Sequence, residues 1–295
     1  MTFTLTSSAI SSYLTCQKKY FYRYREELVK VGESKRALSV GSAVHKGLEV
    51  MYDSEDIEPG VTAALKLLEE SFKETFAGQK EIDEHSQNCR LVVELLRGYW
   101  KHHYDKSNFQ TYLTETVFDL SVAGPFKYFV LKGKTDGLVQ KHDGTWWIRE
   151  FKTVTSVNSQ YFYHKQIENQ ILNYIVATAL TRDIVVSGML YTYIKKPRPI
   201  SEKGWADIAS KITADNFVSA YIPVKLEQKS EQQDLIDQAF EEISGKAHSH
   251  EFMKNTNACF NFNAPCPYLD LCVSGKEFIG NYKKQNPFKE LEDGN

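Results

Sequence analysis

Residues 145–154 read TWWIREFKTV, a run of aromatic and β-branched side chains that is typical of a buried β-strand. Alternate side chains of a strand share a face, so Glu150 and Lys152 point one way while Arg149 and Phe151 point the other. A carboxylate and an ammonium in the inward-facing row of a sheet cost free energy unless the protein uses them. The stretch therefore predicts a central strand that carries functional residues.

A second strand is predicted over residues 126–140, and His142-Asp143-Gly144 between the two strands is typical of a hairpin turn. Residues 136 and 150 are equally far from residue 143, so the hairpin would place Asp136 opposite Glu150. Neighbouring carboxylates repel each other unless a cation lies between them, and oxygen ligands suit Mg²⁺ or Mn²⁺. Lys152 could then orient a water or stabilise developing charge. A plain Glu150–Lys152 ion pair on a solvent-facing strand is the alternative.

The composition indicates an ordinary globular protein. The chain has 295 residues, of which 42% are hydrophobic and 25% charged, enough for a sizeable core. A net charge of −2 excludes a binder that holds nucleic acid through overall positive charge. We find no apolar run of about 20 residues, as a membrane helix requires, and no secretory signal. We therefore expect a soluble, cytoplasmic protein without a membrane partner.

The rest of the chain is predicted to be helical first and then mixed. Helical periodicity marks residues 5–28, 39–53 with Ser39 as its cap, 61–77, 86–104, 160–180 and 229–246. Strand patterns mark residues 111–122, 126–140, 145–154, 184–194 and 217–224. These predict one α/β domain over 1–295 with a mixed central sheet flanked by helices. Within it we expect a helical N-terminal part (1–107), a core (108–225) and a C-terminal helix with a Cys-rich segment (226–295).

These residues together resemble the PD-(D/E)XK nucleases, and most closely the RecB-type branch with its CRISPR-associated exonucleases. That family carries an Asp after one strand and (D/E)-x-K on the next, matched here by Asp136 and Glu150-Phe151-Lys152. The branch's G-x-x-x-H helix is matched by Gly41–His45 and its Q-x-x-x-Y helix by Gln170–Tyr174. Glu115 is a candidate for a Glu often found on an upstream strand. The chain departs from the pattern in having Thr before Asp136, where Pro is usual, and Glu150 where many members have Asp.

The resemblance implies a restriction-endonuclease-like core and a metal-dependent DNA nuclease. The substrate would be single-stranded or free-ended DNA, cut as an exonuclease in DNA recombination, repair or processing, with a helicase or recombination protein as a possible partner. Mg²⁺ or Mn²⁺ would be held by His45, Asp136, Glu150 and the Phe151 carbonyl, and an imidazole ligand favours Mn²⁺. Asp136, Glu150, Lys152, Gln170 and Tyr174 would form the catalytic set. The host would be a bacterium or a phage-infected cell.

A competing hypothesis keeps the fold but not the activity. The chain would then be a catalytically silent nuclease-fold subunit that binds DNA or scaffolds a larger recombination complex. The intact Asp136, Glu150 and Lys152 set argues against silence, because a pure scaffold does not need it.

Four of the five cysteines form a second candidate site. Cys16 lies near the N-terminus, whereas Cys259, Cys266 and Cys272 lie close together near the C-terminus. Four thiolates can hold a zinc ion or a [4Fe–4S] cluster, but the paired spacings of zinc knuckles are absent. The arrangement and its flanking residues resemble the iron–sulfur staple of AddB-type and CRISPR-associated exonucleases, which implies a [4Fe–4S] cluster. Zinc and unligated thiols are the alternatives. Cys89, on a predicted helix, is expected to be a small buried hydrophobic residue.

Overall fold

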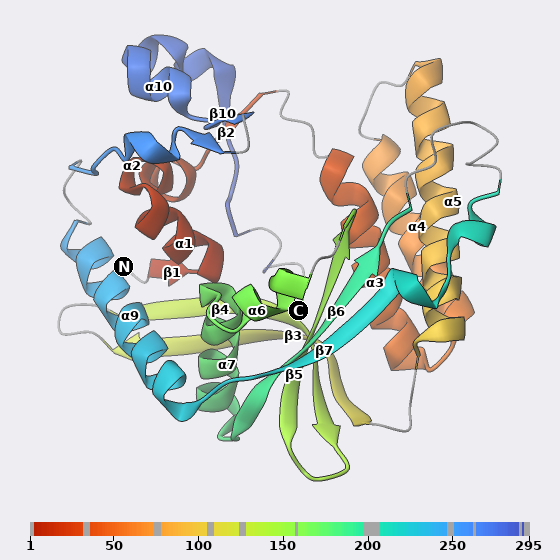
Figure 1. Cartoon of the computed structure of the whole chain (residues 1–295). Helices are drawn as coiled ribbons and strands as arrows, with labels where there is room; N and C mark the ends of the chain where they lie inside the picture. Colours follow the sequence, from red (N-terminus) through yellow and green to blue (C-terminus); the bar gives the residue numbers. More distant parts are fainter. Residues whose placement is uncertain are drawn as a thin grey trace.

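The computed structural model describes residues 3–31, 36–73, 78–104, 109–123, 128–156, 159–197, 207–246, 251–261, 264–288 and 291. Its centre is a 6-stranded mixed sheet with helices on both faces (Figure 1). This architecture confirms the predicted α/β class with a mixed central sheet.

The sheet combines strands from distant parts of the chain. It consists of β1 (Phe3–Leu5), β3 (Phe109–Ala123), β4 (Tyr128–Lys141), β5 (Trp146–Val154), β6 (Val186–Lys195) and β7 (Phe217–Pro223). β3 pairs with β4, which pairs with β1 and β5, and β6 and β7 follow beyond β5. The β1–β4 and β5–β6 pairs are parallel and the others antiparallel.

The β4–β5 hairpin has the predicted register but opens early. Gly144, with φ +83°, closes the turn, and pairing runs from Gln140–Trp146 to Gly137–Arg149. Beyond that pair the two strands separate, and β4 pairs with β1 instead, through Phe129–Leu131. The hairpin therefore forks at Asp136 and Glu150, the first residues past the last pair.

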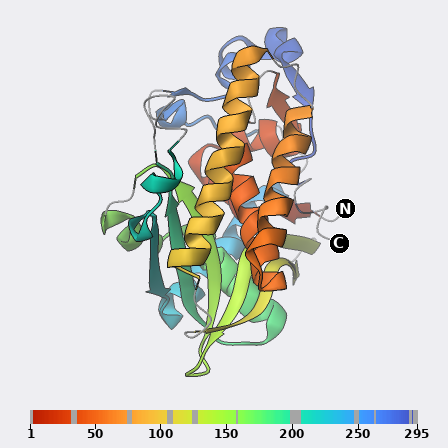
Figure 2. The same cartoon turned by 90° about the vertical axis from the view of Figure 1, so that its right-hand side faces the viewer.

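Different helices cover the two faces of the sheet. On one face lie α3 (Arg36–Ser54), α4 (Ile57–Lys73) and α5 (Gln79–His102) (Figure 2). Their apolar residues enclose Phe151 and Phe217. On the other face α7 (Asn169–Arg182) packs on Ile148, and α9 (Leu226–Gly245) packs on α7. Phe151 and Ile148 thus lie on opposite sides of β5, as the alternation predicts.

Segments from the two ends of the chain meet beside this core. They are α1 (Ser7–Thr15), α2 (Gln17–Tyr20), the π-helix η1 (Phe21–Arg25), β2 (Leu28–Lys30), α10 (Leu269–Ser274) and β10 (Tyr282–Lys284). β2 pairs with β10, and Leu28, Tyr268, Leu271 and Tyr282 form a small core of their own. The remaining short elements are α6 (Ser159–Lys165), η2 (Ala209–Lys211), η3 (Ala214–Asn216), η4 (Thr256–Ala258), β8 (Phe260–Asn261), β9 (Ala264–Pro265) and η5 (Gly275–Asn281).

Three helix predictions were wrong in detail. The helix predicted over 160–180 is two helices, α6 and α7, because the chain turns at 166–168 and Glu168 is extended at ψ 122°. The helix predicted over 5–28 is interrupted at Cys16, whose φ of −161° is extended. Ser39 lies inside α3, which begins at Arg36, and so does not cap it. Periodicity identifies helical residues but not short breaks between helices that tertiary contacts impose.

Arg149 is the largest fully buried side chain, with 1% of its surface exposed. Its guanidinium carbon lies 3.7 Å from the centre of the Tyr52 ring, and Nη2 donates to Thr111 Oγ1 at 2.8 Å. Nε and Nη1 have no hydrogen-bond partner among the described residues. Replacing a poorly paired buried charge by an apolar side chain of similar size is often neutral or stabilising, by about 1–4 kcal/mol.

We therefore expect Arg149→Met to unfold at or above the wild-type temperature, and Arg149→Lys, which keeps a charge without the planar stack, to unfold below it. Thermal unfolding followed by circular dichroism measures both. A strongly destabilised Met variant would mean that the guanidinium has a partner stronger than the Tyr52 ring.

Candidate active site

Three carboxylates occupy one row across three strands at the fork. The pairs Thr114–Gly137 and Thr116–Thr135 place Glu115 of β3 opposite Asp136 of β4. The Gly137–Arg149 pair makes Glu150 the next residue of β5 in the same register. The sequence-predicted Asp136, Glu150 and Glu115 are thus brought to one level of the sheet.

Asp136 is held by two groups from different elements. Its Oδ2 accepts a hydrogen bond of 2.7 Å from the backbone N–H of Phe151, so the side chain replaces the β4 backbone where the strands separate. Its Oδ1 lies 2.9 Å from Nδ1 of His45. His45 reaches the fork from α3. One turn earlier, a Cβ at Gly41 would lie 3.2 Å from Thr153 Oγ1, so glycine lets α3 pack closely on β5 there. The G-x-x-x-H pattern thus has a packing reason here.

Charge and burial shift the pKa values of this cluster. Burial raises the pKa of Glu150 well above its usual range, and the neighbouring Asp136 carboxylate raises it further. Burial alone would lower the pKa of His45, but Asp136 more than offsets it, so the pKa of His45 is raised. Burial also raises the pKa of Glu115, which is ion-paired with Lys134. Within the row, the Asp136 carboxylate therefore opposes the ionisation of Glu150.

The other predicted catalytic residues surround Glu150. Lys152 is exposed, because no β4 backbone flanks the end of β5. On α7, Gln170 Nε2 donates to the Tyr174 hydroxyl at 3.0 Å. Burial and the Glu150 charge raise the pKa of Tyr174. These two α7 residues therefore lie on the Glu150 side of the sheet.

Three residues at this place were not predicted from the sequence. Tyr191 of β6 is the register partner of Glu150, and its pKa is raised by burial and by the Glu150 charge. Lys165, at the end of α6, lies over the Tyr191 ring and forms an ion pair with Glu168. They belong to no motif, and only the α6–α7 turn brings Lys165 to the sheet.

Cys16 and the three C-terminal cysteines lie in one neighbourhood. Asn255 N–H donates to Cys16 Sγ at 3.5 Å, and Cys266 N–H donates to the Cys259 carbonyl at 2.7 Å. Burial raises the pKa of Cys266 and of Cys272, and in each the thiols of Cys16 and Cys259 raise it further. Cys89 is partly buried on α5 among the apolar residues of the α3–α5 side, apart from the other four.

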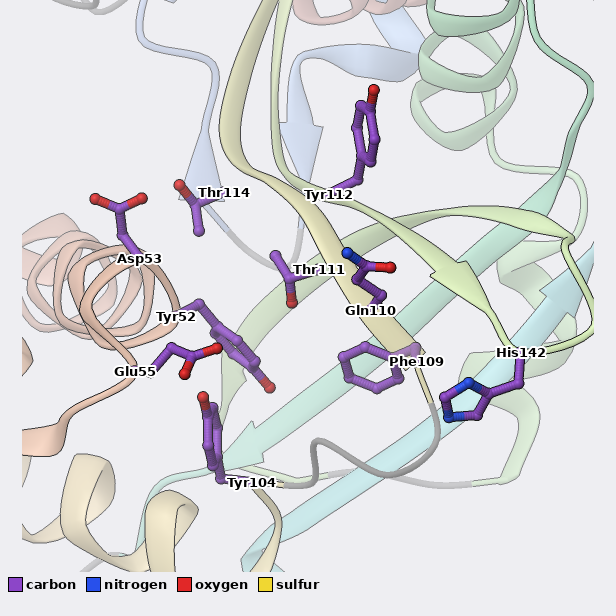
Figure 3. A pocket seen from close by; sticks show the side chains of 10 residues that line it. All are labelled: Tyr52, Asp53, Glu55, Tyr104, Phe109, Gln110, Thr111, Tyr112, Thr114 and His142. Atoms are coloured by element: carbon purple, nitrogen blue, oxygen red, sulfur yellow. The ribbon is translucent and has the colours of Figure 1, made fainter.

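A cavity of about 440 Å³ lies beside β3, and its lining extends from Phe109 to Thr114 and includes His142 of the hairpin turn. Tyr52, Phe109, Thr111 and His142 are among its walls (Figure 3). The first three of these also contact the guanidinium of the buried Arg149. None of the predicted catalytic residues lines it, so the cavity and the carboxylate row are separate features.

Among the described residues, no group of three or more His, Cys, Asp or Glu side chains is arranged closely enough to hold a metal ion. No helix in the described part of the chain is long and apolar enough to cross a membrane.

The sequence matches the model of the PD-(D/E)XK nuclease superfamily over residues 4–273. The chain belongs to the PD-(D/E)XK nuclease superfamily. Two solved structures are similar to this nuclease. The "Putative exonuclease" of Eubacterium rectale aligns with a TM-score of 0.47 and 12% identity over 91% of this chain and 92% of that one. The protein SSO0001 aligns with a TM-score of 0.29 and 16% identity over 68% and 74%. No curated protein matches the sequence.

The family match confirms the superfamily predicted from the motifs, and nucleases of this superfamily typically use divalent metal ions. The donor types at the fork, the carboxylates of Asp136 and Glu150 and the imidazole of His45, are ones that such an ion takes, although the described side chains are not arranged around a common point. The raised pKa of Glu150 agrees with this chemistry. Burial and the Asp136 carboxylate oppose the ionisation of Glu150, whereas a bound cation would favour it.

The shift at Glu150 predicts how the metal-free nuclease responds to pH. Because the pKa of Glu150 is higher in the folded than in the unfolded chain, its stabilising contribution is complete below the ordinary Glu pKa. It is lost as the pH rises through the raised pKa. We therefore expect the unfolding temperature in EDTA to fall with rising pH across this window. Glu150→Gln, which cannot ionise, should show a flatter profile, and equal slopes for the two proteins would contradict the assignment.

Proposed function

We propose that this nuclease hydrolyses phosphodiester bonds of DNA in the presence of Mg²⁺ or Mn²⁺, acting as an exonuclease on single-stranded or free-ended DNA. The observation that carries the proposal is the meeting of Asp136 and Glu150 at the fork with His45 on Asp136. A cation held there by His45, Asp136, Glu150 and the Phe151 carbonyl would polarise a phosphoryl oxygen and lower the pKa of a bound water.

The remaining residues have roles that follow from their positions. Lys152 is exposed beside Glu150 and is therefore available to a phosphate or to an attacking water. Gln170 and Tyr174 are hydrogen-bonded to each other on α7 and would position the DNA strand or Lys152. Glu115 has a charge partner in Lys134, so we give it a supporting role in the acidic row.

The test is digestion of end-labelled DNA with Mn²⁺. We expect free-ended single strands to be shortened from an end, and circular single strands of the same sequence to resist. Lys152→Ala should lower the rate by about 10²–10³-fold, as loss of one charge-stabilising donor does in other enzymes.

Equal digestion by wild type and Lys152→Ala would show that the activity does not come from this site. Binding of DNA by wild type without any digestion would instead favour the silent scaffold.

We also propose that the chain belongs to the RecB-type branch and carries a [4Fe–4S] staple on Cys16, Cys259, Cys266 and Cys272. The effect of Cys16 and Cys259 on the pKa of both Cys266 and Cys272 supports this ligand set. Such a group would tie the two ends of the chain together without redox turnover. A nuclease of this kind would serve DNA recombination, repair or processing, and a helicase or recombination protein would supply unwinding.

A further inference from the structure

Lys165 lies beside the proposed metal site but belongs to none of its motifs. Its ammonium is 5.1 Å from the centre of the Tyr191 ring. Tyr191 and Glu150 are register partners on β5 and β6, and register partners of neighbouring strands present their side chains on the same face. The ammonium of Lys165 is thus on the Glu150 side of the sheet.

The environment of Lys165 is unusual for a lysine. Only 12% of its side chain is exposed, whereas lysines are seldom buried unless they are paired. Its ion-pair partner is Glu168, the residue that precedes the first turn of α7. The Lys165–Glu168 ion pair therefore lies in the connection between α6 and α7, at the edge of the site and just before Gln170 in the chain.

The charges around Lys165 indicate what it can do. Asp136 and Glu150 would be neutralised by a divalent cation, which leaves Glu168 as the carboxylate paired with Lys165. A phosphodiester at the site brings a second anionic acceptor to the same ammonium, and lysine binds phosphate through charge-assisted hydrogen bonds. Lys165 can then exchange one anionic partner for another without leaving the Tyr191 ring, which attracts a cation in either state.

We propose that Lys165 is a second phosphate-binding lysine of this site, held by Glu168 until the DNA strand arrives. The inference rests on the proposed function and adds to it a residue that contacts the substrate. It makes Glu168 a competitor of DNA, so the two members of one ion pair have opposite effects on binding.

The experiment measures binding of a labelled single-stranded oligothymidylate by fluorescence anisotropy across a salt series, with Ca²⁺ in place of Mn²⁺ as the divalent cation and with a check that the strand stays intact. We expect Lys165→Met to weaken binding by about tenfold. Its salt dependence, the slope of log K against log salt, should fall by about 0.7, the value of one phosphate contact on single strands. Glu168→Gln, which releases Lys165, should bind as tightly as wild type or more tightly, with an undiminished slope.

Lys229→Met is the matched control. Lys229 is also a partly buried lysine, but its Nζ donates to the Val186 carbonyl at 2.7 Å, at the start of β6. Its loss removes the same charge away from Glu150, so its affinity and slope should stay close to those of wild type. Lys165→Arg should restore most of the binding that Lys165→Met loses.

Two outcomes would overturn the inference alone. In one, Lys165→Met has the affinity and slope of Lys229→Met. In the other, Glu168→Gln weakens binding together with Lys165→Met, as expected of an ion pair that only supports the fold. If Lys165→Met does not fold, the affinity of Glu168→Gln for the oligothymidylate still tests the proposal. A wild type that neither binds nor digests single-stranded DNA would overturn the proposed function itself.

Discussion

We expect Asp136→Asn to lower DNA digestion by at least about 10³-fold while leaving the fold intact. The carboxylate accepts from Phe151 N–H and faces His45, and Asn keeps the size and one acceptor oxygen but not the charge. Asn at position 136 carries no charge and therefore does not oppose the ionisation of Glu150. Without metal at neutral pH, the free energy of unfolding of the variant should equal or exceed that of wild type.

Activity is expected to fall while stability is kept or raised, so the two measurements test the prediction separately. Digestion with Mn²⁺ measures the loss of activity, and thermal unfolding with and without Mn²⁺ measures stability and metal binding. Wild type should be stabilised by Mn²⁺, and Asp136→Asn much less so. A variant that is inactive because it is unfolded, or one that keeps both digestion and stabilisation by Mn²⁺, would contradict the role of Asp136.

The second large effect is expected at the cysteines. With the proposed [4Fe–4S] cluster, wild type would be brown and contain iron. Cys272→Ser should then lose both, and should unfold the segments that the two chain ends contribute. Metal binding by thiolates is coupled to folding and is worth about 10–16 kcal/mol for structural zinc sites, so losing one ligand costs much of the local stability. Hydrogen bonds such as Asn255 Nδ2 to the Thr15 carbonyl, at 2.8 Å, would remain but would not suffice.

Cys89→Ser provides the matched control, because Cys89 is on α5 and contacts His85 rather than the other thiols. It should keep colour and iron. Iron analysis and hydrogen exchange of residues 7–25 and 264–284 measure the two effects. A colourless wild type that contains zinc would replace the cluster by a zinc site, and a Cys272→Ser protein with full iron would exclude Cys272 as a ligand.

The hairpin shows how far local reasoning reaches. Alternation along residues 145–154 predicts the strand, and the turn at Gly144 fixes the register that brings Asp136 to the level of Glu150. Both follow from interactions between residues close in sequence. The same reasoning missed the break between α6 and α7, because three turn residues leave the helical periodicity on either side almost unchanged.

Sequence motifs identified residues from distant segments but did not predict where those residues lie in the fold. His45 reaches Asp136 only because α3 packs against the fork beside Gly41, and the sequence pattern does not describe that contact. The exposure of Lys152 depends on where β4 leaves β5 to pair with β1. Lys165 has no sequence signature at all.

The sequence by itself determined the strands, the hairpin register and the residue types of the acidic row, because these depend on side-chain periodicity and turn chemistry over short distances. The tertiary structure alone decided which distant groups meet there: His45 on Asp136, Glu115 in the same row, Lys165 over Tyr191, and Cys16 beside the C-terminal thiols. Such contacts form where whole helices and strands pack, and packing depends on the combined shape of many side chains rather than on any one stretch.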